Sequence, residues 1–236
     1  MIRDRSPMTR FGVAGVLLPL VAGLSGCATA LGAAVSAVQL LPGLAAVAGD
    51  TYERTGSSMV EAEYAGLQDK SFAVIVQADQ VLRAQHPEIV SVMTNAITRT
   101  LTGDEVGASG FVPGPRVLEF QYANPRWTAM SYGELADEFV VDRLIIVDLL
   151  EYRLHEPGNM HTWAGRFSAQ VAVVEADSAA PDDFAFSRQV RVSYPDNVRA
   201  RTELSEEHIE SVLQLRAMHR CTWLFFDHEE PNFMRY

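Results

Sequence analysis

The strongest constraint on this chain is a stretch without any charged residue that runs from Phe11 to Gly49. Three arginines precede it, and its first part, Phe11 to Gly23, is a purely apolar run of about 13 residues, whereas a membrane-spanning helix needs about 20. Small residues then follow. A basic start, a short apolar run and a small-residue end are typical of a secretory signal peptide. Residues 1–26 are therefore predicted to be an export signal that is removed from the mature protein.

The end of this signal, Leu24-Ser25-Gly26-Cys27, resembles the lipobox of bacterial lipoproteins at every position. The resemblance implies that Leu24, Ser25 and Gly26 are recognised during processing. It also implies that the sulfur of Cys27 takes a diacylglycerol and that Cys27, with its palmitate-type acyl chains, becomes the first residue of the mature protein. Two or three acyl chains anchor a protein stably, since each buried methylene contributes about 0.8 kcal/mol. The alternative is a chance cysteine behind an ordinary signal or anchor.

Ala28 follows the cysteine at the position where an aspartate retains many such lipoproteins at the inner membrane. The resemblance thus implies an outer-membrane protein that faces the periplasm. The segment from Ala28 to Ala48 stays apolar, which leaves three interpretations open: a helix in contact with the membrane, a helix packed on the protein's own core, or a flexible linker. Residues 50–69 are polar and acidic. We expect residues 27–69 to form a tether and residues 70–236 to form a single globular domain.

Composition and charge limit the classes of partner. The chain has 48% hydrophobic and 21% charged residues, as ordinary globular proteins do. Loss of residues 1–26 removes three of 19 basic groups and one of 30 acidic groups, which leaves 16 and 29 and a net charge of −13. Nucleic acid is excluded as an expected partner because its binding needs a basic surface. The expected partners are the membrane, through the acyl chains on Cys27, and an envelope protein of unknown identity.

The first half of the domain shows strand and helix signals in alternation. The apolar run 72–76 is typical of a strand buried on both faces. Apolar residues at helical spacing follow Pro87 up to Gly103, and a second strand is predicted over 117–122. Ser131 and Glu134 have the spacing of a capping box, which predicts a short helix that ends at Phe139.

The second half predicts three consecutive strands and a final helix. The strands cover 144–150, 167–173 and 184–194, with a turn at Glu156-Pro157-Gly158-Asn159. Ser205 begins a helix that we expect to reach about Phe226. The fold class is α/β with an α+β tendency: one mixed sheet of about five strands in the order β-α-β-α-β-β-β-α. This order, together with the lipobox, resembles small envelope domains of the TolB amino-terminal and CsgG type, which implies a non-enzymatic adaptor or assembly role.

Catalytic motifs are not evident in the sequence, so we expect no enzyme, no cofactor and no metal centre. Three carboxylate pairs are interpreted as solvated surface: Glu61/Glu63, Asp182/Asp183 and Glu229/Glu230. The possible metal ligands near the carboxyl end are His219, Cys221, Asp227, His228 and Glu229. Because Cys221 belongs to an apolar helical stripe, a buried structural thiol is the preferred interpretation. An envelope enzyme or metal-binding protein with an unrecognised site is the alternative function.

For the protein partner, one loop offers three large side chains close together. Trp127, Met130 and Tyr132 are the candidate partner-binding residues, because aromatic and methionine side chains are enriched at protein interfaces.

Overall fold

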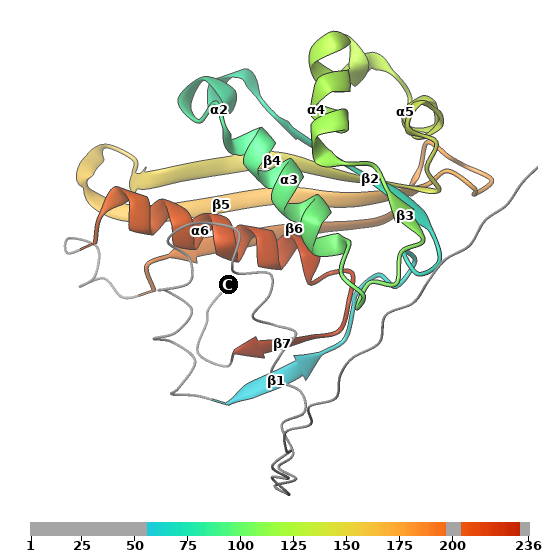
Figure 1. Cartoon of the computed structure of the whole chain (residues 1–236). Coiled ribbons are helices and arrows are strands. Elements are labelled where there is room, and N and C mark those ends of the chain that lie inside the picture. The colour runs from blue at the N-terminus through green and yellow to red at the C-terminus, as the bar shows by residue number, and fades with distance from the viewer. Residues whose placement is uncertain (1–55, 197–203, 232–236) are drawn as a thin grey trace, which may run out of the picture. The chain divides into compact units, whose positions relative to one another are not determined.

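The computed structural model describes residues 56–196 and 204–231 (Figure 1). Its main element is a five-stranded mixed sheet, which confirms the predicted fold class. The strand order is β3 (Gly110–Phe111), β2 (Ser71–Ala78), β4 (Arg143–Glu156), β5 (Asn159–Glu175) and β6 (Phe184–Tyr194). Strand β2 runs parallel to β3 and β4, whereas β4, β5 and β6 form an antiparallel meander. The three consecutive strands predicted from the sequence are this meander.

The buried run at the start of the domain forms β2, as predicted. This strand pairs with a neighbour on each edge, and helices cover both of its faces, so residues 72–76 are at most 1% exposed. The turn between β4 and β5 contains Gly158 at a φ of 79°, a left-handed conformation that glycine adopts without steric cost. This turn confirms the predicted connection, but both flanking strands extend beyond their predicted ends because cross-strand pairing continues into polar residues.

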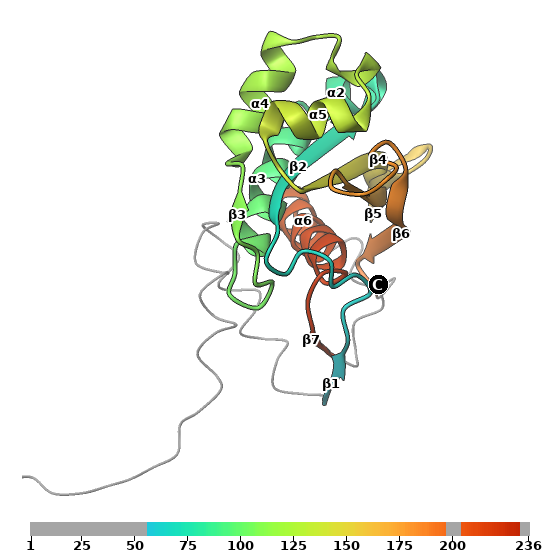
Figure 2. The ribbon, with the colours of Figure 1, turned by 90° about the vertical axis from the view of Figure 1, so that its right-hand side faces the viewer.

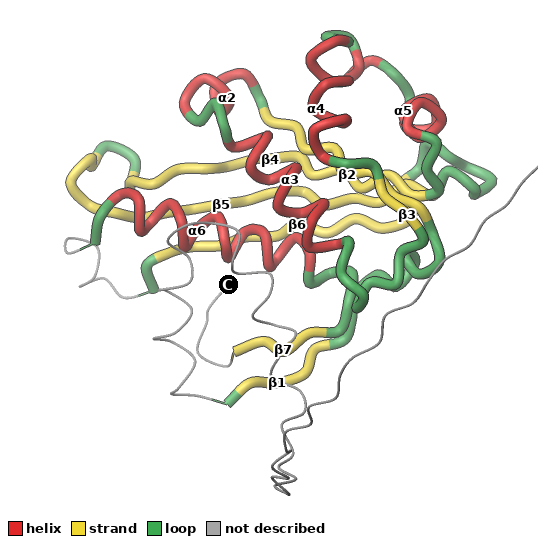
Figure 3. The backbone as a smooth tube through the Cα atoms, in the orientation of Figure 1, coloured by secondary structure: helices red, strands yellow, loops and turns green. Residues whose placement is uncertain are grey.

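Two helices, drawn in red in Figure 3, cover one face of the sheet: α3 (Ile89–Leu101) packs on β2 and on α6, and α6 (Glu206–Thr222) packs on β5 and β6. A short helix, α2 (Gln80–Gln85), precedes α3. The apolar stripe of α3 and that of α6 meet the sheet at one large cluster whose centre includes Phe72, Phe167 and Leu213, all at most 1% exposed. This cluster is the main hydrophobic core.

In the described part of the chain, helices cover the opposite face only over β2 and β4. Here α4 (Gly114–Ala123), the 3-10 helix η2 (Trp127–Ala129) and α5 (Tyr132–Phe139) form a second, smaller cluster with these strands. The predicted strand over 117–122 is wrong, because this segment is α4. Val117 and Phe120 are three residues apart, so on a helix both side chains point at the sheet, and Pro115 occupies the first turn, where its missing N–H costs nothing.

Helix α5 begins as the capping box predicts. The Ser131 hydroxyl accepts a hydrogen bond from the Glu134 backbone N–H at 3.2 Å, and the Glu134 carboxylate accepts one from the Ser131 backbone N–H at 2.9 Å. The helix ends at Phe139, again as predicted. These two reciprocal bonds fix the entry of α5 onto the sheet.

Replacing the capping residue gives a measurable prediction for this helix. We expect Ser131→Ala to lower the free energy of unfolding by about 1 kcal/mol, because the Glu134 backbone N–H loses its acceptor. Ser131→Asp keeps an acceptor and is expected to match the unchanged protein within about 0.3 kcal/mol. Denaturant unfolding of the three proteins measures the difference. Equal loss in both variants would contradict a capping role.

A second, two-stranded sheet joins the two ends of the described chain. Strand β1 (Ser57–Val60) pairs antiparallel with β7 (His228–Pro231), and both lie at the bottom of Figure 1. After β1 the Tyr64 N–H donates to the Leu224 carbonyl at 2.8 Å, and Leu67 is only 1% exposed in the main core. Residues 57–69 therefore belong to the folded domain, which corrects their assignment to the tether.

The same pairing explains why the last helix is shorter than expected. Helix α6 starts after Ser205, whose side chain accepts from the His208 N–H, as predicted, but it ends at Thr222 rather than near Phe226. The residues beyond it turn back so that β7 can reach β1. Within 56–196 and 204–231, no helix is both long and apolar enough to cross a lipid bilayer.

Candidate functional site

Half of one sheet face is left without a helix on it. The alternation along β5 sends Phe167, Ala169 and Val171 into the main core, so the residues between them point to the other side. There, α4 and α5 cover β2 and β4 near their amino ends but leave the rest of β4, β5 and β6 uncovered among the described residues (Figure 2). We call this surface the open face. Its residues are Glu151, Arg153, Arg166, Ser168, Gln170, Ser187, Gln189, Arg191 and Ser193.

Cross-strand hydrogen bonds order the middle of the open face. The Gln170 amide donates to the Ser187 hydroxyl at 2.7 Å, and the Gln189 amide donates to the Ser168 hydroxyl at 3.3 Å. Both bonds join β5 to β6. Side chains held in this way lose less conformational entropy when a partner covers them, so the open face presents a largely preformed polar surface.

Three arginines lie at the end of the open face nearest the β4–β5 turn. Arg153 is directly opposite Arg166 in the register of β4 and β5. The Arg153 guanidinium is held by the Glu151 carboxylate at 2.6 Å and by the His155 carbonyl at 2.6 Å. Arg166 is exposed and forms no ion pair with any described residue, and Arg191 only donates to the Gln189 side chain. Two of the three guanidinium groups thus have no carboxylate partner in the described chain.

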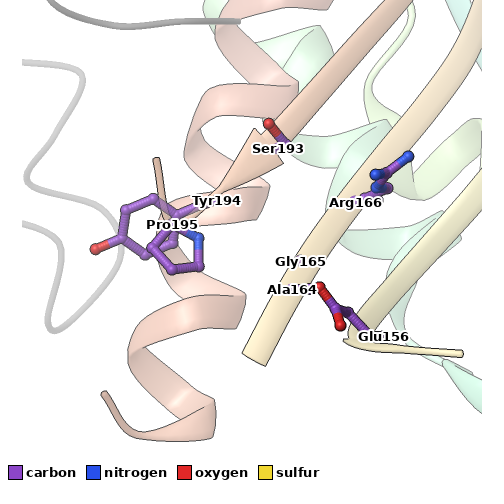
Figure 4. Close-up of a pocket in the computed structure, with 7 residues that line it drawn as sticks. All are labelled: Glu156, Ala164, Gly165, Arg166, Ser193, Tyr194 and Pro195. Atoms are coloured by element: carbon purple, nitrogen blue, oxygen red, sulfur yellow. The ribbon is translucent and has the colours of Figure 1, made fainter. Parts of the chain in front are cut away.

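Two of these arginines, Arg166 and Arg191, border the larger of two adjoining hollows. The larger one has a volume of 270 Å³ and is lined by residues of β4, β5 and β6: Glu151, Arg166, Phe167, Ser168, Arg191, Val192 and Ser193. A smaller one of 90 Å³ shares Arg166 and Ser193 and is shown in Figure 4. In that view Ser193, Tyr194 and Pro195 form its β6 side, across from Glu156 and Arg166. The larger hollow can accept one side chain or a small anionic group.

One carboxyl group with a raised pKa borders the open face. Burial raises the pKa of Asp148, an effect that the nearby Asp79 reinforces and that a hydrogen bond with Gln77 opposes. Asp148 lies opposite Gln170 in the register of β4 and β5, so this carboxyl group is next to the hydrogen-bonded amides and hydroxyls.

The candidate partner-binding residues lie at the border between the second cluster and the open face. Trp127 is 8% exposed and packs inside that cluster, so its ring helps to hold α4 and α5 on the sheet. Met130 and Tyr132 are partly buried against the same cluster. Tyr132 contacts Phe184 of β6, with ring centroids 5.1 Å apart, and Phe184 is 46% exposed. Partner binding by these residues stays a prediction. The export and lipidation residues Leu24, Ser25, Gly26 and Cys27 lie outside the described residues.

The possible metal ligands near the carboxyl end are not gathered around one point. Cys221 is fully buried in the main core, which confirms the structural thiol, and burial raises the pKa of that thiol to about 12. His219 and His228 both stack on the Trp223 ring, with centroid distances of 4.8 Å and 4.4 Å. The Asp227 carboxylate accepts from the Ala62 N–H. Within the described ranges, no three histidine, cysteine or acidic side chains are placed to share an ion.

The carboxylate pairs interpreted as solvated surface are exposed except for Glu230, which is half-buried, and one member of each pair also has a structural partner. Glu63 forms an ion pair with Arg188 at 3.2 Å, and Glu230 approaches Arg220 at 3.4 Å. Asp182 accepts from the Gly133 N–H at the start of α5. The contacts of Glu63 and Asp182 join segments that are distant in sequence, so these two carboxylates help to hold loops in place.

Sequence reasoning did not single out the open face as a site. The alternation in β5 predicted one wet strand face, but the cluster depends on register, which places Arg166 beside Arg153 and Ser193. Three arginines far apart in sequence give no local signal. A helical-wheel or motif search would miss them.

Comparisons with known proteins identify no family. No family model matches the sequence, and no curated protein matches it. Lipoprotein GNA1162 from Neisseria meningitidis is 15% identical, with 62% of this chain and 97% of that chain covered and a TM-score of 0.41. The PelC dodecamer from Paraburkholderia phytofirmans is 11% identical, with 73% and 99% covered and a TM-score of 0.41. Protein XCC0632 from Xanthomonas campestris is 8% identical, with 73% and 90% covered and a TM-score of 0.42. At these values the similarities carry no function over to this chain.

Proposed function

We propose that this chain is a membrane-anchored envelope lipoprotein whose folded domain acts as a non-enzymatic adaptor or assembly factor. Leu24-Ser25-Gly26-Cys27 supports the anchor, because this is the pattern at which bacterial lipoproteins are acylated. The outer membrane, with the domain facing the periplasm, is the proposed location. The resemblance to envelope domains of the TolB amino-terminal and CsgG type supports the same role and stays a prediction.

The open face carries the adaptor role. An antiparallel sheet in a small domain commonly packs one face on the core and leaves the other face solvated. Here the uncovered half has exposed β6 residues, hydrogen-bonded amides and hydroxyls, and two arginines, Arg166 and Arg191, that have no carboxylate partner among the described residues. Protein interfaces are polar at their rims and enriched in arginine. A partner protein that covers this face would satisfy these groups.

Site-specific crosslinking in the producing cells tests this role. A photoreactive benzoylphenylalanine replaces Ser187 on the open face in one protein and Glu207, exposed on α6 at the opposite face, in a matched control. We expect a discrete protein adduct from position 187, none from position 207, and loss of the adduct in a Cys27→Ser background, since the partner would be met at the membrane. The same adducts from both positions, or no adduct from position 187, would contradict the adaptor role.

A further inference from the structure

The outer edge of β6 is unpaired in the described part of the chain. Strand β6 pairs with β5 on one side, and no described strand lies on the other. An edge of this kind presents a row of backbone N–H and C=O groups that can accept another strand. The strand covers Phe184–Tyr194, and the Ser193 carbonyl already accepts a hydrogen bond from the Arg216 guanidinium at 3.0 Å. Residues 184–192 are still long enough to pair with a strand of common length.

Charged residues on β6 have different surroundings on its two faces. Arg188 points to the helix-covered side and is neutralised by Glu63 at 3.2 Å. Arg191 points to the open face, where it lies beside the 270 Å³ hollow together with Arg166. Charged residues commonly protect edge strands from unwanted pairing. On this edge, the uncompensated charge is on the open face alone.

An added strand would bring its side chains close to these arginines. Residues directly opposite each other on neighbouring strands have Cβ atoms about 5 Å apart, and alternate residues share a face. A strand beside β6 would therefore place every second side chain next to Gln189, Arg191 or Ser193. An acidic side chain at the middle position would lie next to Arg191.

The arginines favour an acidic occupant. Like charges directly opposite each other on neighbouring strands are destabilising, and Arg153 and Arg166 are such a pair. Glu151 compensates Arg153 at 2.6 Å, which leaves Arg166 and Arg191 to interact with another anion. The chain is acidic overall, at −11, so this end of the open face differs in sign from the protein's net charge.

We infer that β6 is the docking edge for an extended acidic segment of a partner protein, which adds as a further strand and places a carboxylate next to Arg191, at the arginine end of the open face. Backbone pairing with β6 supplies affinity without sequence preference, and the two arginines select for acidic side chains on alternate positions. The inference rests on the proposed adaptor role, because it names the chemistry of the partner on the same surface.

Peptide binding to the full lipidated chain in mild detergent tests the inference. The probe is a fluorescent peptide of about nine residues with alternating threonine and glutamate, and the matched probe has lysine in place of glutamate. We expect anisotropy to show binding of the glutamate peptide alone. Arg166→Gln with Arg191→Gln should weaken it about ten-fold or more, whereas Arg188→Gln, on the same strand but the other face, should change it less than about two-fold.

Backbone pairing needs its own measurement, because two arginines could hold a carboxylate without an added strand. Two glutamate peptides carry N-methyl groups on alternate residues, each blocking one of the two hydrogen-bonding edges. One of them should lose binding and the other should keep it. Equal binding of both, or equal binding of the glutamate and lysine peptides, would overturn the inference. So would self-association of the chain in sedimentation that Arg191→Gln abolishes, because a second copy would then occupy the edge.

The two proposals can fail separately. If the peptide does not bind while the adduct from position 187 persists, the docking edge is wrong and the adaptor role stands. If the peptide binds as expected and position 187 gives no adduct, the adaptor role in cells is wrong and β6 remains an acidic-strand binder in solution.

Discussion

A chain that begins at Lys70 is expected to melt about 10 °C or more below a chain that begins at Thr51. The shorter chain lacks β1, the partner of β7, and lacks Leu67, whose full burial contributes about 1.5 to 3 kcal/mol. It also loses the hydrogen bond from the Tyr64 hydroxyl to Glu175 at 2.8 Å, worth about 1 kcal/mol or more. In a domain of this size, a loss of several kcal/mol in the free energy of unfolding lowers the melting temperature by about 10 °C or more.

Thermal melts of three proteins in the same mild detergent measure this effect. The third begins at Cys27 with Cys27→Ser, and we expect it to melt with the chain that begins at Thr51, since residues 28–48 are predicted to be a tether. Leu67→Ala in the chain that begins at Thr51 measures the contribution of this buried side chain alone. It should lower the free energy of unfolding by about 2 to 5 kcal/mol. Equal midpoints for the chains that begin at Lys70 and Thr51 would show that residues 57–69 contribute nothing to the fold.

Acid is expected to destabilise the domain by about 3 kcal/mol between pH 7.5 and 4 because of His219 alone. Burial lowers the pKa of His219 from 6.5 to about 4, and the nearby His228 lowers it further. The unfolded chain therefore takes up the proton first as pH falls. Stability from this residue is fully present above about pH 6.5 and is lost progressively down to the folded pKa near 4.

Denaturant unfolding at pH 7.5 and pH 4 measures this loss, and His219→Phe identifies its source. Phenylalanine keeps a ring against Trp223 but cannot be protonated, so most of the pH dependence should disappear. Burial also lowers the pKa of His86, so a smaller acid dependence should remain. The control is His161→Phe, at an exposed position beside the β4–β5 turn. An unchanged pH dependence in His219→Phe would rule out His219 as its source.

Features that depend on a few neighbouring residues could be predicted from the sequence. The capping box at Ser131 and the helix start at Ser205 form hydrogen bonds to residues three positions ahead, so their signal is local. The buried run of β2 was recognisable for a related reason, because a strand covered on both faces needs apolar residues throughout. The secondary structure of residues 117–122 could not be predicted reliably. In so short a segment, the apolar positions fit both the alternation of a strand and the spacing of a helix.

Features that depend on pairing between distant segments could not be predicted. Strands β1 and β7 are short and polar, and each is a strand only because the other end of the chain lies beside it. The open face has the same origin. The wet side of β5 was predicted from its alternation, but its arginine cluster follows from registers that bring Arg153, Arg166 and Arg191 together. No local sequence pattern indicates those strand registers.

The intact mass of the mature protein, purified from membranes, tests the lipoprotein assignment most directly. We expect a chain that begins at Cys27, with a mass increased by a diacylglycerol and by a further acyl group where the amino terminus is modified. Cys27→Ser should abolish this increase and the partitioning of the protein into detergent. A chain in membranes that begins elsewhere, or that carries an unmodified Cys27, would contradict the account.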